Sequence, residues 1–594
     1  MSDFIFSTRN IERLCMSNAL HSIYEKEFPQ VSYFNGSWGS LGFTKNIYNG
    51  YEPYETEQYL IVVIGGPLLT FKKNDFINQE NSNLGTKAIF ERWKSGNMIW
   101  DEDLNGPFSV LIINKAKQEV ICITDIMSYI PIFKYYNNNH YTLSSHIDMI
   151  STVIKKSSDI DDVSLVDFIL HGTVTFPYTI FKDIYQIQPA STHVYALNSN
   201  ELKVKKYWEP YETNKYTDMN QTAKYLRKCL ESNINMVTSQ TTNIAQFISG
   251  GEDSRTLSGL LKDINRDAYI YLDGMNREGK IAKIIADKYN ANFKPANRDQ
   301  YHYLNIMEKC ADLIGSGAEY HHAHTYGFHK YLVKYDAVYG GLFSDALLKG
   351  ARIKKTKLTN KFIFLPNKKN KTNLLNENLS NEIFDKKIID ELKERRNNHY
   401  YYIKTYRKES AEEWFELWPS SMNRNIPNIH ANRRLFKSYE PFLSNEIVKV
   451  SANIPQKWKL NRNLFNMIAK PYLKKSKWVL HGDGWYPYYS YKFNTMISFI
   501  TWTNRQIGKR IGYIKGNQGP WASWKKIINS EKWEQKASDY SIGLSYINKM
   551  FKEKLNDKKL KGELSTLQYI AFTQVLYQLQ KRYTNEKESK KTFK

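Results

Sequence analysis

The chain has 594 residues, a length that predicts more than one domain, and 41% of them are hydrophobic, which is enough for ordinary packed cores. Its four cysteines show no CxxC spacing, which argues against a disulfide framework and against a cysteine-based zinc site. The formal net charge of +24 fits either solvated lysines or an acidic partner, and no RNA-binding motif accompanies it, so charge alone does not choose a function.

The sequence gives no sign of a targeting or membrane-spanning segment. The first 15 residues lack the apolar run of a signal peptide. The apolar stretch 59–71 is short and broken by glycines, so we expect a buried strand pair rather than a membrane span. We therefore expect a cytoplasmic protein without a membrane span.

Short β-type runs separated by turn residues fill the first part of the chain. Examples are "YLIVVIG", "FSVLIIN", "EVICITD" and "STHVYAL". They predict an antiparallel α+β domain over residues 1–206, and "YWEPYETNKY" (207–216) reads as a linker into the next part.

From about residue 220 the pattern changes to helices that alternate with buried strands. We expect helices at 222–237 and 278–290, and strands at 244–248, 267–273 and 335–341. This alternation predicts a parallel sheet with helices on its faces. We place this α/β domain at 207–500 and a helical, basic C-terminal extension at 501–594.

The stretch "ISGGEDS" (248–254) joins one of these strands to a helix. Ligands of open parallel sheets sit beyond the carboxyl ends of the strands. Gly250 and Gly251 allow backbone N–H groups to approach a phosphate, and the following helix adds its positive dipole end. Ser249 and Ser254 can donate hydroxyl hydrogen bonds, whereas Asp253 suits a Mg²⁺ ion that bridges phosphates. The alternative is a helix cap at a tight turn; the full motif favours phosphate binding.

Ser-Gly-Gly-x-Asp-Ser after a strand resembles the pyrophosphate loop of the ATP-pyrophosphatase group, whose members cleave ATP between its α- and β-phosphates. Residues 40–485 further resemble the asparagine synthetases, in the order of that family. The segments that carry the resemblance are 104–150, 167–191, "YGGLFSD" (339–345) and "YEPFLSNEIVKVSANIP" (439–455). The resemblance implies an N-terminal-nucleophile-like sandwich of α+β type followed by an α/β ATP-pyrophosphatase (adenine nucleotide α-hydrolase-like) domain.

The resemblance also implies ATP and Mg²⁺ as cofactors. Asp253 and Asp345 would hold the metal. The residues that would contact the nucleotide are Ile248, Ser249, Gly250, Gly251, Asp253, Ser254, Leu272, Gly340, Gly341 and Ser344.

The sequence departs from the family at several positions. The family hydrolyses glutamine with an N-terminal cysteine; here Ser2 follows Met1 and Cys15 is internal, so we expect an inactive glutaminase. Family glutamates of the second ATP motif fall on Leu342 and Ala346, and a family lysine falls on Gly482. Lys437 and Tyr439 replace a family glutamate and arginine, and Lys349 or Lys477 could supply the lost cation.

Three functions remain open, and no catalytic residue is assigned. The favoured one is an ATP-dependent amide-forming ligase that adenylates a small-molecule or peptide carboxylate, with acidic sugars among the candidates, and joins it to ammonia or an amine. The second is a non-catalytic nucleotide-binding module. The third, a nucleic-acid-acting relative, rests on charge only, and we do not expect a nucleic-acid partner.

The segment "EYHHAHTYGFHKY" (319–331) contains four histidines. A metal cluster is one interpretation; the favoured one is a helix near the ATP site with one or two histidines that face the substrate. The histidines are His321, His322, His324 and His329.

Overall fold

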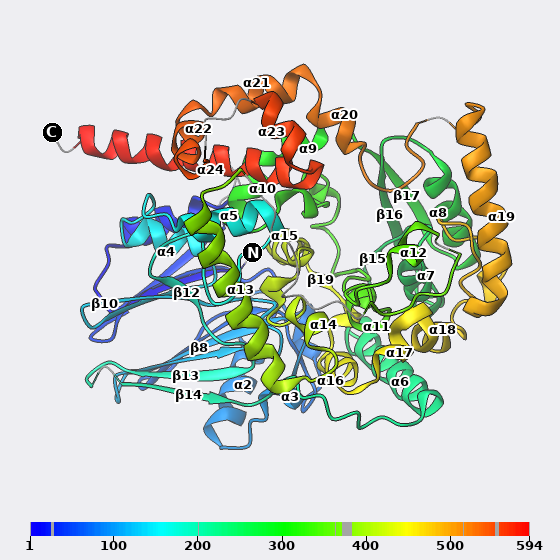
Figure 1. Cartoon of the computed structure of the whole chain (residues 1–594). Coiled ribbons are helices and arrows are strands. Elements are labelled where there is room, and N and C mark those ends of the chain that lie inside the picture. Colours follow the sequence, from blue (N-terminus) through cyan, green and yellow to red (C-terminus); the bar gives the residue numbers. More distant parts are fainter. Residues whose placement is uncertain are drawn as a thin grey trace.

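The computed structural model describes residues 2–24, 29–199, 201–362, 364–370, 383–514, 516–552 and 557–592. Met1 and the last two residues lie outside the described part of the chain. Figure 1 shows a strand-rich N-terminal domain, a second domain on a separate sheet, and C-terminal helices that run along the outside of both.

Two antiparallel sheets form the N-terminal domain. The first has the order β12-β10-β11-β1-β3-β2 and the second β14-β13-β9-β8-β5-β4. The strands of the first are β1 (Phe4–Ser7), β2 (Val31–Gly36), β3 (Gly39–Thr44), β10 (Phe133–Asn137), β11 (His140–Ser144) and β12 (Ile184–Gln186). Those of the second are β4 (Tyr54–Glu55), β5 (Tyr59–Gly65), β8 (Phe108–Asn114), β9 (Glu119–Thr124), β13 (Ser191–Ala196) and β14 (Glu201–Lys206).

Alternating side chains hold the two sheets together. Leu60, Val62 and Ile64 of β5 pack in one cluster with residues of β1 and β3, while Ile61 and Val63 point to the opposite face. Both faces of β5 are therefore buried. Segment 59–71 forms two strands, as expected, but β5 pairs with β4 and β8, and β6 (Leu68–Leu69) pairs with β7 (Leu104–Asn105).

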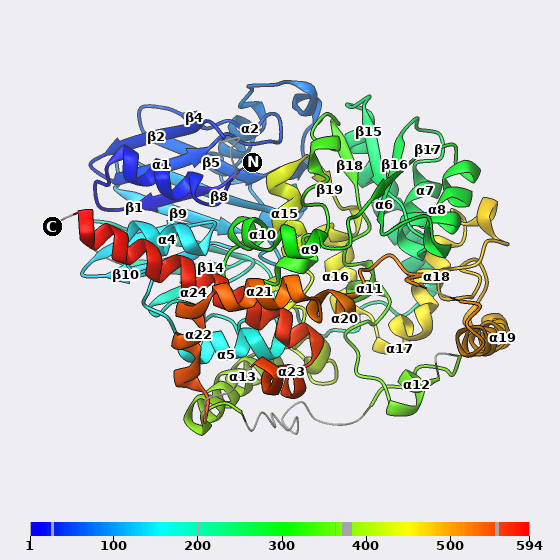
Figure 2. The ribbon, with the colours of Figure 1, turned by 90° about the horizontal axis from the view of Figure 1, so that it is seen from above.

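Helices cover the outer face of the first sheet. Figure 2 shows α1 and α4 lying over this sheet near the C-terminal helix. The helices of this domain are α1 (Arg13–His21), α2 (Leu84–Lys94), α3 (Trp100–Asp103), α4 (Ile147–Val153) and α5 (Asp162–His171).

The second domain is built on a five-stranded parallel sheet of order β17-β16-β15-β18-β19. Its strands are β15 (Ile244–Phe247), β16 (Asp267–Leu272), β17 (Asn292–Asn297), β18 (Ala337–Tyr339) and β19 (Ser438–Tyr439). The helices at the first three strands are α6 (Met219–Thr238), α7 (Glu252–Leu260) and α8 (Arg277–Lys288). The predicted two-domain fold class is confirmed by these sheets.

The remaining helices lie between and around the two sheets. They are α9 (His302–Asn305), α10 (Met307–Ile314), α11 (Ser344–Leu348), α12 (Lys357–Lys361), α13 (Lys386–Tyr406), α14 (Ala411–Phe415), α15 (Ile426–Leu435), α16 (Asn445–Asn453), α17 (Gln456–Lys459) and α18 (Asn463–Ala469).

The C-terminal helices are α19 (Tyr491–Arg510), α20 (Trp524–Ile528), α21 (Glu531–Asp539), α22 (Ser541–Ile547), α23 (Asp557–Glu563) and α24 (Thr566–Thr592). Helix α19 runs across residues 500 and 501, where we placed the last domain boundary. All four cysteines are free thiols. Among the described residues, no helix combines the length and apolar composition that crossing a bilayer requires.

Candidate functional site

Hydrogen bonds to its own two serine side chains stabilise the loop between β15 and α7. The Ser249 N–H donates to Ser254 Oγ (3.1 Å), and the Gly251 N–H donates to Ser249 Oγ (3.0 Å). The two hydroxyl oxygens lie 2.8 Å apart. The helix begins at Glu252, so the sequence-predicted strand, glycine turn and helix follow one another as expected.

A carboxylate that the sequence analysis missed lies against this loop. Gly250 donates its N–H to Glu278 Oε1 at 2.6 Å, and Glu278 comes from the first turn of α8. A Cβ at Gly250 would lie 2.8 Å from Glu278 Oε2, and one at Gly482 would lie 2.4 Å from the same atom. Gly482 also donates its N–H to the Gly250 carbonyl oxygen. Glycine at 482, where the family has lysine, is therefore what lets Glu278 reach the loop.

The two carboxylates predicted to hold a metal share one lysine. Lys349 Nζ lies 2.7 Å from Asp253 Oδ1 and 2.8 Å from Asp253 Oδ2, and it also forms an ion pair with Asp345. Burial raises the pKa of Asp253 to about 7, an effect that Lys349 opposes and Asp345 reinforces. The pKa of Asp345 is lowered, because Lys349 outweighs the effect of burial. The predicted metal ligands thus converge on one point, and a cation of the chain itself occupies it.

Further charged and aromatic groups line the same region. The buried carboxylate of Glu252 accepts from Arg462 Nη1 at 3.0 Å, and the Arg462 guanidinium carbon lies 3.4 Å from the centre of the Trp485 ring. Trp485 stacks on His481. Segment 481–486 therefore lies beside the 249–254 loop, with Arg462 as an additional cation.

The loop after β18 approaches Asp253 closely. A Cβ at Gly341 would lie 3.0 Å from Asp253 Cβ, so only a residue without a side chain fits there without a shift. Ser344 donates to the Gly341 carbonyl oxygen at 3.2 Å. Phe343 has φ +66°, a left-handed conformation that favours glycine. Ile248 and Leu272 pack in one apolar cluster, so all the sequence-predicted nucleotide contacts lie at the carboxyl ends of β15, β16 and β18.

A second missed carboxylate, Glu440, lies behind this loop. Burial raises its pKa to about 8, although Leu342 N–H and the Ser438 hydroxyl donate to it at 3.0 and 3.3 Å. A Cβ at Gly340 would lie 2.2 Å from Glu440 Oε1. Glu440 lies between Tyr439 and Pro441, and the family pattern did not mark it as a functional residue.

A small cavity of about 40 Å³ lies between the two domains, with room for little more than one water at ~30 Å³. Gly65, Gly66 and Asn105 line it from the N-terminal domain, and Arg433 and Glu440 from the second domain.

Ser2 lies buried close to this cavity. Its hydroxyl accepts from the Gly65 N–H at 3.1 Å, and its carbonyl oxygen accepts from Arg433 at 2.7 Å. Asp3 beside it is fully buried, and Arg433 and Arg434 hold its pKa well below the usual range although burial acts to raise it. Arg433 thus joins the cavity to the start of the chain.

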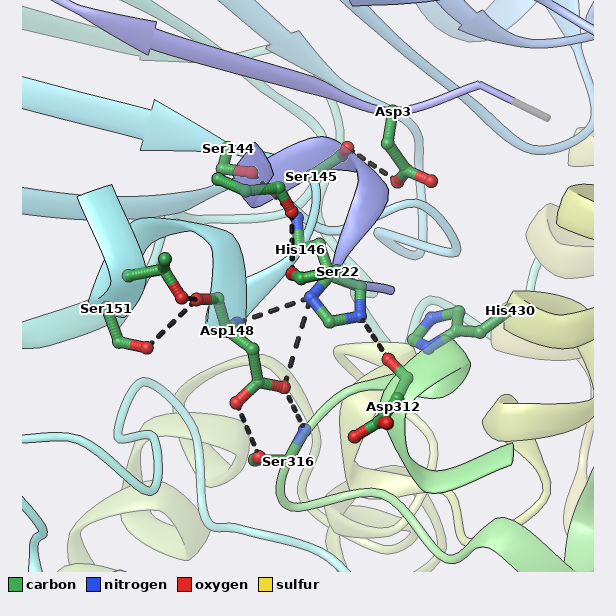
Figure 3. Close-up of polar contacts among 12 residues, drawn as sticks. Asp3, Ser22, Ser144, Ser145, His146, Asp148, Ser151, Asp312, Ser316 and His430 are labelled. Carbon is green, nitrogen blue, oxygen red and sulfur yellow. Dashed lines mark hydrogen bonds and ion pairs between the residues drawn. The ribbon is translucent and has the colours of Figure 1, made fainter. Parts of the chain in front are cut away.

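Polar contacts next to Asp3 connect the N-terminal domain to the chain around Asp312 and Ser316, as Figure 3 shows, and a further contact reaches the last helix. Ser145 donates to Asp3 at 2.7 Å, and the neighbouring His146 Nε2 donates to the Asp312 carbonyl oxygen at 3.1 Å. Asp148 accepts from the N–H and the hydroxyl of Ser316 at 2.9 and 2.7 Å, as Figure 3 shows. Arg582 of α24 donates to the same Asp148 carboxylate at 2.9 Å.

The histidine-rich segment 319–331 does not form the helix that we expected. It contains two short 3₁₀ turns, Tyr320–His322 and His329–Tyr331, because Gly327 and the turns around it interrupt helical geometry. Glu319, His321 and His322 bring possible ligand atoms within 4.8 Å of one another. Arg424 already forms two hydrogen bonds with the Glu319 carboxylate, at 3.0 and 2.5 Å, so this group is neutralised by a guanidinium.

Comparison with known proteins agrees with this arrangement. Residues 79–208 match the model of a glutamine amidotransferase domain. A Methanocaldococcus jannaschii protein with the provisional name asparagine synthetase 2 (glutamine-hydrolyzing) is 21% identical over 259 residues, 42% of this chain. The match spans about half of that relative, 49% of its length.

Two solved structures are similar over 42% of this chain and 60% of their own. One is the glutamine phosphoribosylpyrophosphate amidotransferase of B. subtilis with ADP and GMP (11% identity), and the other is an allosteric regulatory enzyme of purine biosynthesis (10% identity). Both have a TM-score of 0.23, which is too low to bear on the fold.

The match of residues 79–208 to a glutamine amidotransferase domain and the partial match to an asparagine synthetase together show that the chain resembles asparagine synthetase-like amidotransferases.

Proposed function

We propose that the protein is an ATP-dependent, amide-forming ligase that converts a carboxylate into an acyl-adenylate and then joins it to ammonia or an amine. The observation that carries the proposal is the convergence of Asp253 and Asp345 on one cation, beside the glycine loop and at the carboxyl edge of a parallel sheet. ATP, Mg²⁺ and the nucleotide contacts from Ile248 to Ser344 belong to this proposal.

Two carboxylates at one point suit Mg²⁺, which prefers oxygen ligands and is bound together with substrate phosphates. In this proposal Asp253 and Asp345 hold the metal, and Lys349, once displaced from between them, remains close enough to pair with a phosphate. When bound, Mg²⁺ would offset the negative charge of the leaving pyrophosphate. Lys349 thereby takes the place of the cation that Gly482 cannot supply.

The reaction has two balanced steps. A carboxylate oxygen of the acceptor attacks the α-phosphorus of ATP, and the bond to the β-phosphate oxygen breaks, so that pyrophosphate leaves. A nitrogen lone pair then attacks the acyl carbon, AMP leaves with the bonding electron pair, and the nitrogen loses a proton. The chain's contribution is to hold the phosphates with the loop N–H groups and to place positive charge where the leaving groups become more negative.

A basic cavity of about 640 Å³ next to the loop supports an acidic acceptor. Arg277, Arg505, Lys509 and Lys526 line it. Arg505 donates to the carbonyl oxygens of Gly482 and Asp483, and Arg277 directly precedes Glu278, so the cavity borders the 249–254 loop.

Carboxylates of the described chain do not neutralise these four cations through ion pairs. Among the described residues, none of them forms an ion pair, and the buried Nε of Arg277 has no hydrogen-bond partner. Burial and the nearby Arg277 lower the pKa of Arg505, and Asp483 only partly opposes this effect, which indicates that the two guanidinium groups lie close together. An acceptor that carries further negative charge, such as an acidic sugar, would relieve this repulsion.

The test is pyrophosphate release by the purified chain with MgATP across a panel of acidic sugars, amino acids and peptides. We expect release only with a matching carboxylate, and a higher KM for that acceptor, with ATP affinity unchanged, in Arg277→Ala. Lys262→Ala is the matched control, because Lys262 is an exposed cation of the same domain. MgATP binding without turnover on any acceptor, including native-host extract, would instead support a nucleotide-binding module.

A further inference from the structure

Helix α19 turns its apolar side outward. Figures 1 and 2 both place it at the edge of the molecule. The residues that it buries are Asn494, Ser498 and Gly508, whereas large apolar residues on the other side are exposed. A helix packed on a globular protein normally shows the reverse arrangement.

Five of the exposed apolar residues lie along one face of the helix, whereas Phe499 (48% exposed) lies off this face, and the polar Thr503 and Asn504 separate Ile500 from Ile507. Relative to the first of the five, these residues are spaced i, i+3, i+7, i+14 and i+18, which places them on one face of a helix with 3.6 residues per turn. We call these residues the apolar stripe: Phe493 (46% exposed), Met496 (67%), Ile500 (46%), Ile507 (51%) and Ile511 (72%).

Aromatic side chains extend the stripe at both ends. Tyr489 stacks on Phe493 at 4.4 Å between ring centres and contacts Trp478, which is 61% exposed. Just beyond the other end, Tyr513 is 85% exposed. Trp and Tyr are the residues that membrane–water interfaces favour, because they combine an apolar ring with a polar tip.

The charge around the stripe has one sign. From Gly484 to Ser530 the sequence contains no Asp or Glu, and it contains seven basic residues: Lys492, Arg505, Lys509, Arg510, Lys515, Lys525 and Lys526. With 3.6 residues per turn, Lys492 and Arg510 lie directly beside the stripe, and an apolar stripe flanked by these cations is complementary to a surface that is apolar beneath and negatively charged on top. A second copy of this chain would bring the same positive charge to the contact and would be repelled.

We infer that α19 docks on the surface of an anionic lipid bilayer, with the apolar stripe in the headgroup region and the flanking cations Lys492 and Arg510 on lipid phosphates. This inference does not depend on the proposed function, because it concerns the outward face of α19 and not the 249–254 loop. It assigns the enzyme a place at a membrane surface without a membrane-spanning helix.

The experiment is flotation of the full chain with vesicles of phosphatidylcholine alone or mixed with phosphatidylglycerol. We expect binding to the anionic vesicles, at least about tenfold weaker binding to phosphatidylcholine alone, and weakening with added salt. The double variant Met496→Glu/Ile507→Glu should lose anionic-vesicle binding by about tenfold or more, since two negative charges replace two inserted side chains. Leu14→Glu, at an equally exposed apolar residue of α1, should bind like the wild type.

Circular dichroism and melting temperature verify that the variants are folded, which exposed positions should allow. Wild-type protein that fails to bind anionic vesicles, or a folded double variant that binds as well as the wild type, would overturn the inference. So would a dimer in sedimentation analysis that the double variant dissociates while vesicles leave it unaffected, because α19 would then be an interface between two copies.

Discussion

Lys349 Nζ lies within 2.8 Å of both carboxylate oxygens of Asp253, so one ammonium group neutralises a buried acid at the carboxyl end of the parallel sheet. Asp345, four residues before Lys349, contacts the same ammonium. A site that must accept a doubly charged metal together with the phosphates of a nucleotide would exchange this internal cation for an external one.

Asp253→Ala should weaken MgATP binding by at least about tenfold, or ~1.4 kcal/mol, because it removes a proposed metal ligand and leaves Lys349 without its main partner. Isothermal titration calorimetry measures this affinity. Asp263→Ala, an exposed acid just beyond the same helix, is the control and should bind like the wild type. Equal MgATP affinity in wild type and Asp253→Ala would contradict the phosphate-loop interpretation.

Lys349→Met should make the protein depend on Mg²⁺ for stability. At a pH above that at which Asp253 takes up a proton, Asp253 and Asp345 repel each other without the ammonium, and Mg²⁺ relieves the repulsion. We expect the variant to melt at a lower temperature than the wild type in chelator and to regain more of its stability than the wild type when Mg²⁺ is added. Lys262→Met serves as the control. A variant whose melting temperature does not change when Mg²⁺ is added would show that the two acids do not form a metal site.

MgATP binding should weaken as the pH falls below about 7. Burial raises the pKa of Asp253 to that value, so its carboxylate takes up a proton there and loses its affinity for a cation. Calorimetric titrations at about pH 6 and about pH 8 compare MgATP binding by the protonated and the ionised forms of Asp253. Binding that is as tight at the lower value as at the higher one would mean that Asp253 stays ionised or does not bind the metal.

Glu440→Gln should flatten the pH dependence of folding stability. The folded protein keeps Glu440 protonated up to about pH 8, whereas the unfolded chain ionises near the ordinary glutamate pKa. The folded state therefore binds more protons between these values, and this group lowers stability as the pH rises, by up to about 1.4 kcal/mol per pH unit. Urea unfolding of wild type and variant across this range tests the sign: an identical slope in both would show that Glu440 is ionised in the folded protein.

The sequence predicted the helices and strands better than it predicted the contacts between their side chains. The alternation of strands and helices after residue 220 and the glycine-rich turn at 249–251 are local patterns, and both appear where expected. The sequence analysis missed Glu278 and Glu440 because their contacts are with glycines far away in the sequence. Glu278 lies against Gly250 and Gly482, and Glu440 lies against Gly340. Asp345 and Lys349 are one helical turn apart, and this spacing predicts their ion pair. The contact between Lys349 and Asp253 joins residues that are distant in sequence, so spacing could not predict it.

The histidine segment shows the opposite error. Four histidines close in sequence suggested a helix beside the nucleotide, but Gly327 and the turns around it leave only two 3₁₀ turns. The exposed stripe of α19 is likewise invisible to pattern analysis, since an amphipathic helix does not reveal which of its faces meets the protein.

With glutamine as substrate, the chain with serine at position 2 should release no glutamate, and Ser2→Ala should leave the ligase activity unchanged. The Ser2 hydroxyl is buried and accepts from the Gly65 N–H, and a hydroxyl is a weaker nucleophile than a thiol. A coupled glutamate assay on the purified protein measures this. Glutamate release that disappears in Ser2→Ala would restore a nucleophilic role to Ser2.

The central claim is ATP cleavage between the α- and β-phosphates, and the identity of the products tests it most directly. Phosphorus NMR of a reaction with MgATP, an accepted carboxylate and ammonia should show AMP and pyrophosphate in equal amounts. Formation of both should be lost in Asp345→Asn, which keeps the size of the side chain but removes its charge. ADP and phosphate as the products, or undiminished AMP formation by Asp345→Asn, would contradict the account.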